Sequence, residues 1–177
     1  MKKTFILIFA CCSLTAFSQT NKSFQIGLGS SFLGSGDIIA GVFEAELGYK
    51  LNPYFSTALG INSGFGYQNI ELRESTTYQQ LNTNIYVSPF RNNRKVDFKI
   101  GTGVSANYVL ERRINWLSSV FPSPRINESR FSVGVNMIVE TTITIENNFL
   151  LGFKGFIQPY ANGDINSGIL VKFGKAF

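Results

Sequence analysis

KVDFKIGTGVSANYVL, residues 95–110, is the stretch that decides the fold of this chain. Every second residue from Val96 to Leu110 is uncharged and mostly apolar, whereas the residues between them include Asp97, Lys99 and two glycines. Successive side chains of an extended chain leave opposite faces, so alternation of this length predicts a β-strand with one apolar and one polar face. We expect the apolar face to meet lipid and the polar face to line the inside of a narrow barrel.

Seven further segments alternate in the same way, so the sequence predicts eight strands. Three joints between them are tight, and the other four vary in length, as is typical of barrels that span outer membranes. We therefore predict an all-β fold, an eight-stranded antiparallel up-and-down transmembrane β-barrel with both chain ends in the periplasm. The predicted strands are residues 23–33, 38–51, 54–67, 76–90, 95–110, 130–145, 149–158 and 167–177.

Charge is divided unequally between the two faces of these strands. The apolar face carries only Lys175, at the end of the last strand, where its ammonium group can reach the membrane interface. A Lys or Arg at the lipid midplane costs about 2–4 kcal/mol, so this asymmetry favours a lipid-facing apolar surface. A soluble ligand-binding barrel or a β-sandwich would share the alternation, but its outer face should be densely charged, and here the polar face is rich in glycine. The nine charged residues of the polar face are Glu44, Glu46, Lys50, Lys95, Asp97, Lys99, Glu140, Lys154 and Lys172.

These nine charges nearly balance, with four acidic and five basic residues. Buried charges must be paired, so we predict that they form a salt-bridged network that plugs the lumen. The carboxylates could instead form an acid/base pair or a cation site, but the cost of unpaired buried charge favours the network. Small side chains such as glycine suit an eight-stranded barrel, whose interior is just wide enough for side chains to fill.

Residues 1–18 are predicted to be a secretory signal peptide. Lys2 and Lys3 form its positive end, residues 5–14 its apolar run, and residues 16–18 its small-x-small cleavage site. The predicted domains are therefore a signal peptide, 1–18, and an outer-membrane barrel, 19–177, placed in the outer membrane after Sec-dependent export. Loss of the two lysines would lower the formal charge from +5 to +3, which gives no argument for a nucleic-acid partner.

Residues that carry catalysis are scarce in this sequence. It has no histidine, and both cysteines, Cys11 and Cys12, lie in the predicted signal. An alternative use of Cys11 as a lipoprotein site is disfavoured by the bulky Phe9 and by the apolar run beyond it. Residues 101–106 match G-x-G-x-x-A, but a dinucleotide site needs this motif to open a helix, and here it lies within a strand. We predict no enzyme activity, no cofactor and no metal.

The end of the signal at Ser18 and Gln19, the glycine-rich stretch from Lys99 to Leu110, and a last strand ending in Phe carry a family resemblance. The chain resembles the small outer-membrane barrels of the OmpA and OmpX type and is similar to the "outer membrane protein beta-barrel domain" proteins of Bacteroidota. The resemblance implies a fold and a membrane, and it implies insertion by the barrel-assembly machinery. Lys175 departs from the apolar residue often found in the signal that this machinery reads. The residues that match the signal are Ile169, Val171, Phe173 and Phe177.

The longest predicted loop, Glu111 to Ser129, combines arginines with large apolar side chains. These side chains could bind lipopolysaccharide phosphates or a surface protein partner. Alternatively, the aromatic rings could pack over the barrel rim, and the sequence does not decide between binding and packing. We predict a monomer in outer-membrane lipid with a structural or surface-interaction role. The alternatives are a small-solute pore and an accessory barrel in secretion or envelope assembly. The candidate contact residues of the loop are Arg112, Arg113, Trp116, Phe121 and Arg125.

Overall fold

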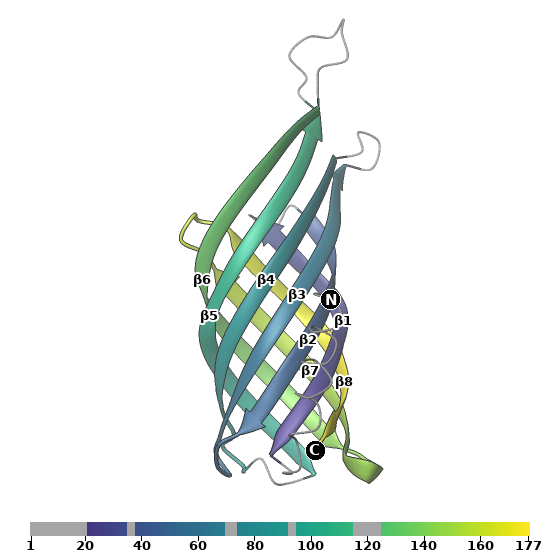
Figure 1. The fold of residues 1–177 in the computed structure, drawn as a ribbon, viewed down its shortest axis with the longest axis vertical. Helices are drawn as coiled ribbons and strands as arrows, with labels where there is room; N and C mark the ends of the chain where they lie inside the picture. Colours follow the sequence, from purple (N-terminus) through teal and green to yellow (C-terminus); the bar gives the residue numbers. More distant parts are fainter. Residues whose placement is uncertain (1–20, 35–37, 70–73, 92–94, 115–124) are drawn as a thin grey trace, which may run out of the picture.

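The chain forms one closed β-barrel in a computed structural model that describes residues 21–34, 38–69, 74–91, 95–114 and 125–177 (Figure 1). Each strand pairs antiparallel with its neighbours in sequence, and β1 closes the barrel against β8. The eight strands are β1 (Lys22–Gly34), β2 (Ile38–Lys50), β3 (Phe55–Asn69), β4 (Glu74–Val87), β5 (Val96–Ile114), β6 (Arg125–Thr144), β7 (Phe149–Pro159) and β8 (Ile165–Ala176).

The predicted fold class and strand number are confirmed. The chain passes from β2 to β3, from β4 to β5 and from β6 to β7 at one end, where Phe177 also lies; we call this the turn end, and the opposite end of the barrel is the loop end (Figure 1). At the turn end, the Asn52 side chain accepts hydrogen bonds from the backbone N–H groups of Tyr54 and Phe55, both at 2.8 Å. A 3₁₀ turn, Glu146–Asn148, joins β6 to β7. No helix among the described residues is long and apolar enough to cross a membrane.

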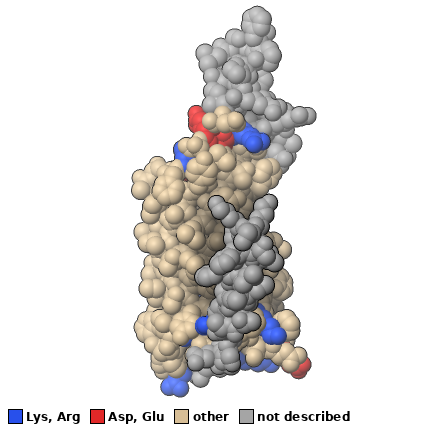
Figure 2. Space-filling model, in the orientation of Figure 1, with Lys and Arg blue, Asp and Glu red and all other residues tan. Residues whose placement is uncertain are grey.

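The predicted orientation of the two faces is also found. Outward side chains of the strand that decides the fold are exposed, for example Ile100 and Val104, whereas Asp97, Ser105 and Asn107 are buried in the barrel. On the face shown in Figure 2, Lys, Arg, Asp and Glu lie near the two ends, and the part of the wall that is visible between them shows none of these residues. The outer face therefore presents a continuous apolar band, and the polar residues are covered by the wall.

Two strands are longer than the sequence pattern predicts. Residues 111–129 were expected to form a loop, but β5 continues to Ile114 and β6 begins at Arg125, with pairs that run from Glu111↔Glu128 to Ile114↔Arg125. The pattern missed this extension because the charged run from Glu111 to Arg113 interrupts the alternation. The resulting β5–β6 hairpin rises farthest at the loop end, and β3 and β4 end a little below it (Figure 1).

The core of the molecule is the filled interior of the barrel. Three buried tyrosines pack on glycines of neighbouring strands: Tyr78 pairs with Gly64, Tyr86 with Gly101, and Tyr160 with Gly134. A Cβ atom on Gly101 would lie 2.5 Å from the Tyr86 ring, so only glycine leaves room for it. The inward glycines thus make space for rings. The buried apolar residues that join this core include Leu33, Ile38, Val42, Val109, Ile138, Phe156 and Leu170.

Candidate functional site

Seven charged side chains gather inside the barrel toward the turn end, and we call them the lumen network. They come from β2, β5, β6, β7 and β8, and alternation along each strand turns them inward. Glu44 on β2 meets Lys154 on β7, so the contacts cross the lumen from one wall to the other. The members of the lumen network are Glu44, Glu46, Asp97, Lys99, Glu140, Lys154 and Lys172.

Two lysines connect three carboxylates at the centre of this network. Lys154 Nζ donates to Glu44 Oε1 and Oε2 at 2.9 and 2.8 Å and to Glu46 Oε2 at 2.9 Å. Lys172 Nζ donates to Glu46 Oε1 at 2.6 Å and to Glu140 Oε2 at 2.8 Å. All five side chains are at most 3% exposed. Each buried charge has an opposite charge in hydrogen-bond contact, which is what burial of an ion requires.

Neighbouring residues extend the network toward the turn end. Lys99 Nζ donates to Glu140 Oε1 at 3.1 Å and lies 3.8 Å from Asp97 Oδ2. The Thr142 hydroxyl donates to the same Glu140 oxygen at 3.0 Å. Gly27 on β1 lies between Glu44 and Lys172, where a Cβ atom would approach both side chains to 3.3 Å.

Two of the nine predicted inward charges lie outside this cluster. The structure places Lys50, half-buried, and Lys95, exposed, at the turn-end mouth of the barrel. Lys95 is exposed and comes before β5 begins, so it does not belong to the buried part of the network. Lys50 is the last residue of β2 and is attracted by Asp97, so its membership of the network stays a prediction.

A second polar layer, made of amides, lies inside the barrel and was not predicted. Gln80 Nε2 donates to Gln158 Oε1 at 2.6 Å, and Asn136 Nδ2 donates to Asn84 Oδ1 at 2.6 Å. Amide-rich alternation along residues 78–86 was visible in the sequence, but it carries no sign of which side chains meet across the lumen. These amide pairs bond without charge, although other amide atoms of the layer, such as Asn84 Nδ2 and both polar atoms of the Asn107 side chain, have no hydrogen-bond partner among the described residues.

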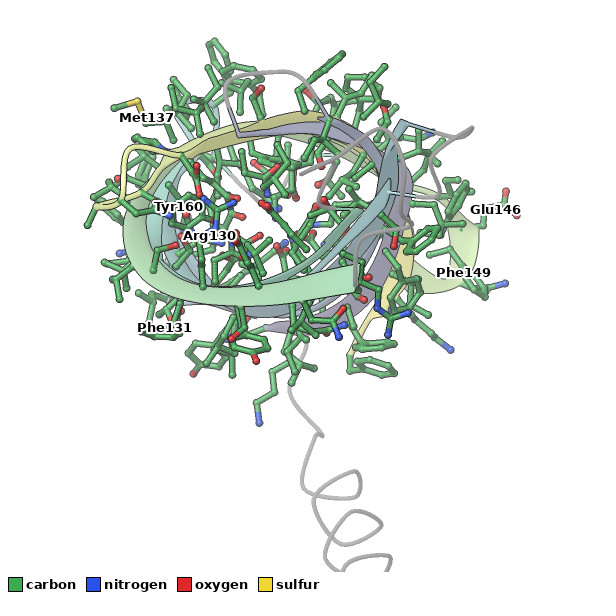
Figure 3. The ribbon with its side chains drawn as sticks, turned by 90° about the horizontal axis from the view of Figure 1, so that it is seen from above. Arg130, Phe131, Met137, Glu146, Phe149 and Tyr160 are labelled. Carbon is green, nitrogen blue, oxygen red and sulfur yellow. The ribbon has the colours of Figure 1, made fainter. Side chains whose placement is uncertain are left out.

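At the loop end, the β5–β6 hairpin is anchored by charge. Arg130 forms an ion pair with Glu111 across the hairpin and lies 3.9 Å from Asp164, in the loop after β7. Arg130 and Tyr160 lie within the ring of strands when the barrel is viewed along its axis, whereas Phe131 and Met137 point outward (Figure 3). β7 pairs with β6 only from Met137 onward, apart from the bridge of Tyr160 to Gly134. Within the described residues, no strand pairs with that edge of β6 before residue 133.

The candidate contact residues of this hairpin are only partly covered by the structure. Arg112 is exposed on β5. Arg113 and Arg125 lie in β5 and β6, but their side chains are outside the described part. Trp116 and Phe121 lie outside the described residues altogether.

The four residues of the expected assembly signal all lie on the outer face at β8 and the chain end. Ile169, Val171, Phe173 and Phe177 are exposed. Lys175 lies on the same face, with its Nζ atom 5.6 Å from the centre of the Phe149 ring. This contact is consistent with a lysine that lies at the border of the apolar band.

A closed barrel of eight antiparallel strands, with an apolar outer band and a charged interior, defines the class of small barrels that span outer membranes. Solved structures share this fold. Neisserial surface protein A matches with a TM-score of 0.69 at 12% identity, over 88% of this chain and 97% of that one. Ail, the attachment invasion locus protein of Yersinia pestis, matches with a TM-score of 0.62 at 13% identity, over 89% and 99%.

The N-terminal β-barrel domain of OprF from Pseudomonas aeruginosa also matches, with a TM-score of 0.53 at 13% identity over 86% of this chain and 96% of that one. No family model and no curated protein matches the sequence. The likeness is therefore one of fold, and the closer similarity to the Bacteroidota proteins stays a prediction.

Proposed function

We propose that this protein is a non-catalytic outer-membrane barrel that binds a partner at the cell surface through its β5–β6 hairpin. The observation that carries the proposal is the edge of β6 between residues 125 and 132, with which no strand among the described residues pairs, on a hairpin that extends beyond the barrel. Backbone N–H and C=O groups on such an edge can pair with an extended segment of another protein. The partner we propose is therefore a protein segment that adds as a strand to β6.

The base of the hairpin is suited to hold this edge in place. The ion pair of Arg130 with Glu111 joins β6 to β5, and Asp164 lies near the same guanidinium group. An edge fixed before binding loses less conformational entropy on association than a flexible segment would. Ail is an attachment invasion locus protein, and its similar fold supports a surface role here as part of this proposal.

The lumen network supports the proposal that the barrel is closed rather than a pore. Lys154 and Lys172 connect carboxylates from β2 and β6 across the interior, with both lysines at most 2% exposed. Breaking one such pair leaves a buried charge without a partner, at a cost of about 3–5 kcal/mol. Thermal opening of a path for solutes through this layer would thus be rare. The accessory role in secretion or envelope assembly stays a prediction, which co-purification of partners in detergent would test.

The hairpin is tested by replacing residues 109–130 with Asn-Gly, a sequence that closes a two-residue turn between Tyr108 and Phe131 and removes the β6 edge up to residue 130. Peptides from a displayed random library are selected on the intact barrel in lipid discs and then measured on the variant. We expect the selected peptides to lose binding to the variant, which keeps its heat-modifiable migration on a gel.

The control variant replaces residues 70–73, the connection between β3 and β4, with the same two residues. It should bind the selected peptides as the intact barrel does. Equal binding to all three proteins, or equal loss in both variants, would contradict the assignment to β5–β6.

A further inference from the structure

A cavity of about 280 Å³ lies at the turn end of the barrel, on the far side of the lumen network from the hairpin. Residues from β1, β2 and β5 to β8 contribute to its lining. Its charged lining residues are the lysines Lys22, Lys50, Lys95 and Lys99 and the carboxylate Asp97. Four positive charges and one negative charge give these described lining residues a formal charge of +3.

The positive charges converge because several elements end at this mouth. Lys22 begins β1, Lys50 ends β2, and Lys95 precedes β5. Lys50 is attracted by Asp97 and, less strongly, repelled by Lys99. Toward the lumen, Lys99 donates to Thr142 at 3.4 Å and to Glu140, so the cavity ends on the lumen network. A bound anion would relieve the repulsion among the lysines, and it would enter from the turn end.

The carboxylate of Asp97 restricts which anions the cavity can bind. The residue is 6% exposed, and within the described part of the chain its Oδ1 atom has no hydrogen-bond partner. A buried carboxylate oxygen without a donor is costly, so a ligand that brings an O–H group would be favoured. A fully ionised oxyanion would instead bring its lone pairs against this oxygen and be disfavoured.

We infer that the turn-end cavity is a binding site for a protonated phosphate group. Lysine ammonium groups bind phosphate oxygens as point charges. Inorganic phosphate keeps at least one O–H group at neutral pH, and Asp97 Oδ1 can accept its hydrogen bond. Sulfate has the same shape but no proton to donate. The site therefore prefers inorganic phosphate, or a phosphate monoester in its singly protonated form, over sulfate, and this preference separates it from a general attraction for anions.

The test is calorimetric titration of the purified full chain in detergent with sodium phosphate and with sodium sulfate, at pH 7 and equal ionic strength. We expect saturable phosphate binding and at least about tenfold weaker sulfate binding, the effect of one hydrogen bond to a charged group. Absence of saturable phosphate binding, or equal affinity for the two anions, would overturn the inference.

Variants locate the binding and its selectivity. The double variant Lys50→Gln/Lys95→Gln should weaken phosphate binding by about tenfold or more, because it removes two lysines of the cavity. The matched control, Arg91→Gln/Lys175→Gln, removes the same charge from the same end but outside the described cavity lining, and it should bind phosphate as the intact barrel does. Equal loss in both would show attraction by net charge alone and refute the site. Asp97→Asn should remove the preference for phosphate over sulfate, and an unchanged preference would refute the role of Asp97.

Two sources of the phosphate group are separated by repeating the titration in lipid discs. In discs of phosphatidylcholine with phosphatidic acid, a lipid phosphate monoester that fills the cavity should compete and lower the apparent affinity for inorganic phosphate, relative to discs of phosphatidylcholine alone. Equal affinity in the two kinds of disc would assign the site to a free phosphate. Loss of all binding in both would contradict the inference. Heat-modifiable migration checks the folding of each variant.

Discussion

Lys154 holds the centre of the lumen network, because its ammonium group contacts Glu44 and Glu46 within 2.9 Å and is almost fully buried. The inward direction of these side chains could be predicted from alternation along single strands. The pairing of Glu44 with Lys154 could not, since it depends on how β2 and β7 face each other across a closed barrel. The packing of tyrosine rings on glycines could not be predicted either, because it depends on the register between neighbouring strands.

Lys154→Met should destabilise the barrel by about 3–5 kcal/mol, because it leaves the buried Glu44 without its hydrogen-bonded lysine and Glu46 with Lys172 as its one remaining described lysine partner. Urea unfolding in lipid vesicles measures the change. Lys175→Met, which removes the same group from the outer face, should leave the free energy of unfolding nearly unchanged. A loss in Lys154→Met no larger than that in Lys175→Met would contradict the energetic role given to the network.

Gly101→Ala should destabilise the barrel by about 1–3 kcal/mol, because the added methyl group displaces the buried Tyr86 ring. Gly155→Ala is the matched control, since a Cβ atom there has only one neighbour within 4 Å, Val139 O at 4.0 Å. Unfolding of both variants in urea, compared with the intact barrel, checks this prediction. Equal stability of the two would show that the inward glycine is not needed to seat the ring.

At the scale of elements, the sequence predicted the number, order and facing of the strands better than their ends. The strand that decides the fold was predicted over residues 95–110, but β5 runs from Val96 to Ile114, and charge on both faces concealed the extension. Lys95 was predicted to point inward because it alternates with the apolar residues of the strand, but it precedes β5 and is exposed. Alternation in the sequence indicates which face of the strand a side chain lies on, but it does not indicate where the strand begins or ends.

The last strand gives the prediction at this scale. Phe177→Ser should lower the amount of folded barrel in the outer membrane of cells several-fold, because the assembly machinery would lose the terminal ring of its signal. Refolding of the purified variant from urea into detergent should be unchanged. Phe149→Ser removes another exposed ring from the turn end and should assemble normally in cells. If both variants assemble equally poorly, the effect belongs to the apolar band and the signal assignment fails.

For the whole molecule, the lumen network and the amide layer together predict a barrel that passes no steady ionic current. Planar bilayer recording of the purified protein should show no large, stable conductance steps. Stable steps that persist in the intact protein would refute the closed lumen and favour the small-solute pore. A leak that appears only in Lys154→Met would instead agree with closure by the network.

The central claim is that the outer face of the barrel meets lipid. Residues 19–177 contain no cysteine, so a single spin label can be placed at Val104, in the apolar band, or at Arg112, farther along the same face of β5. In bilayer vesicles, collisions with oxygen, which dissolves in lipid, are compared with collisions with a water-soluble nickel complex. The account predicts that oxygen dominates at Val104 and nickel at Arg112. Dominance of the nickel complex at Val104 would contradict it.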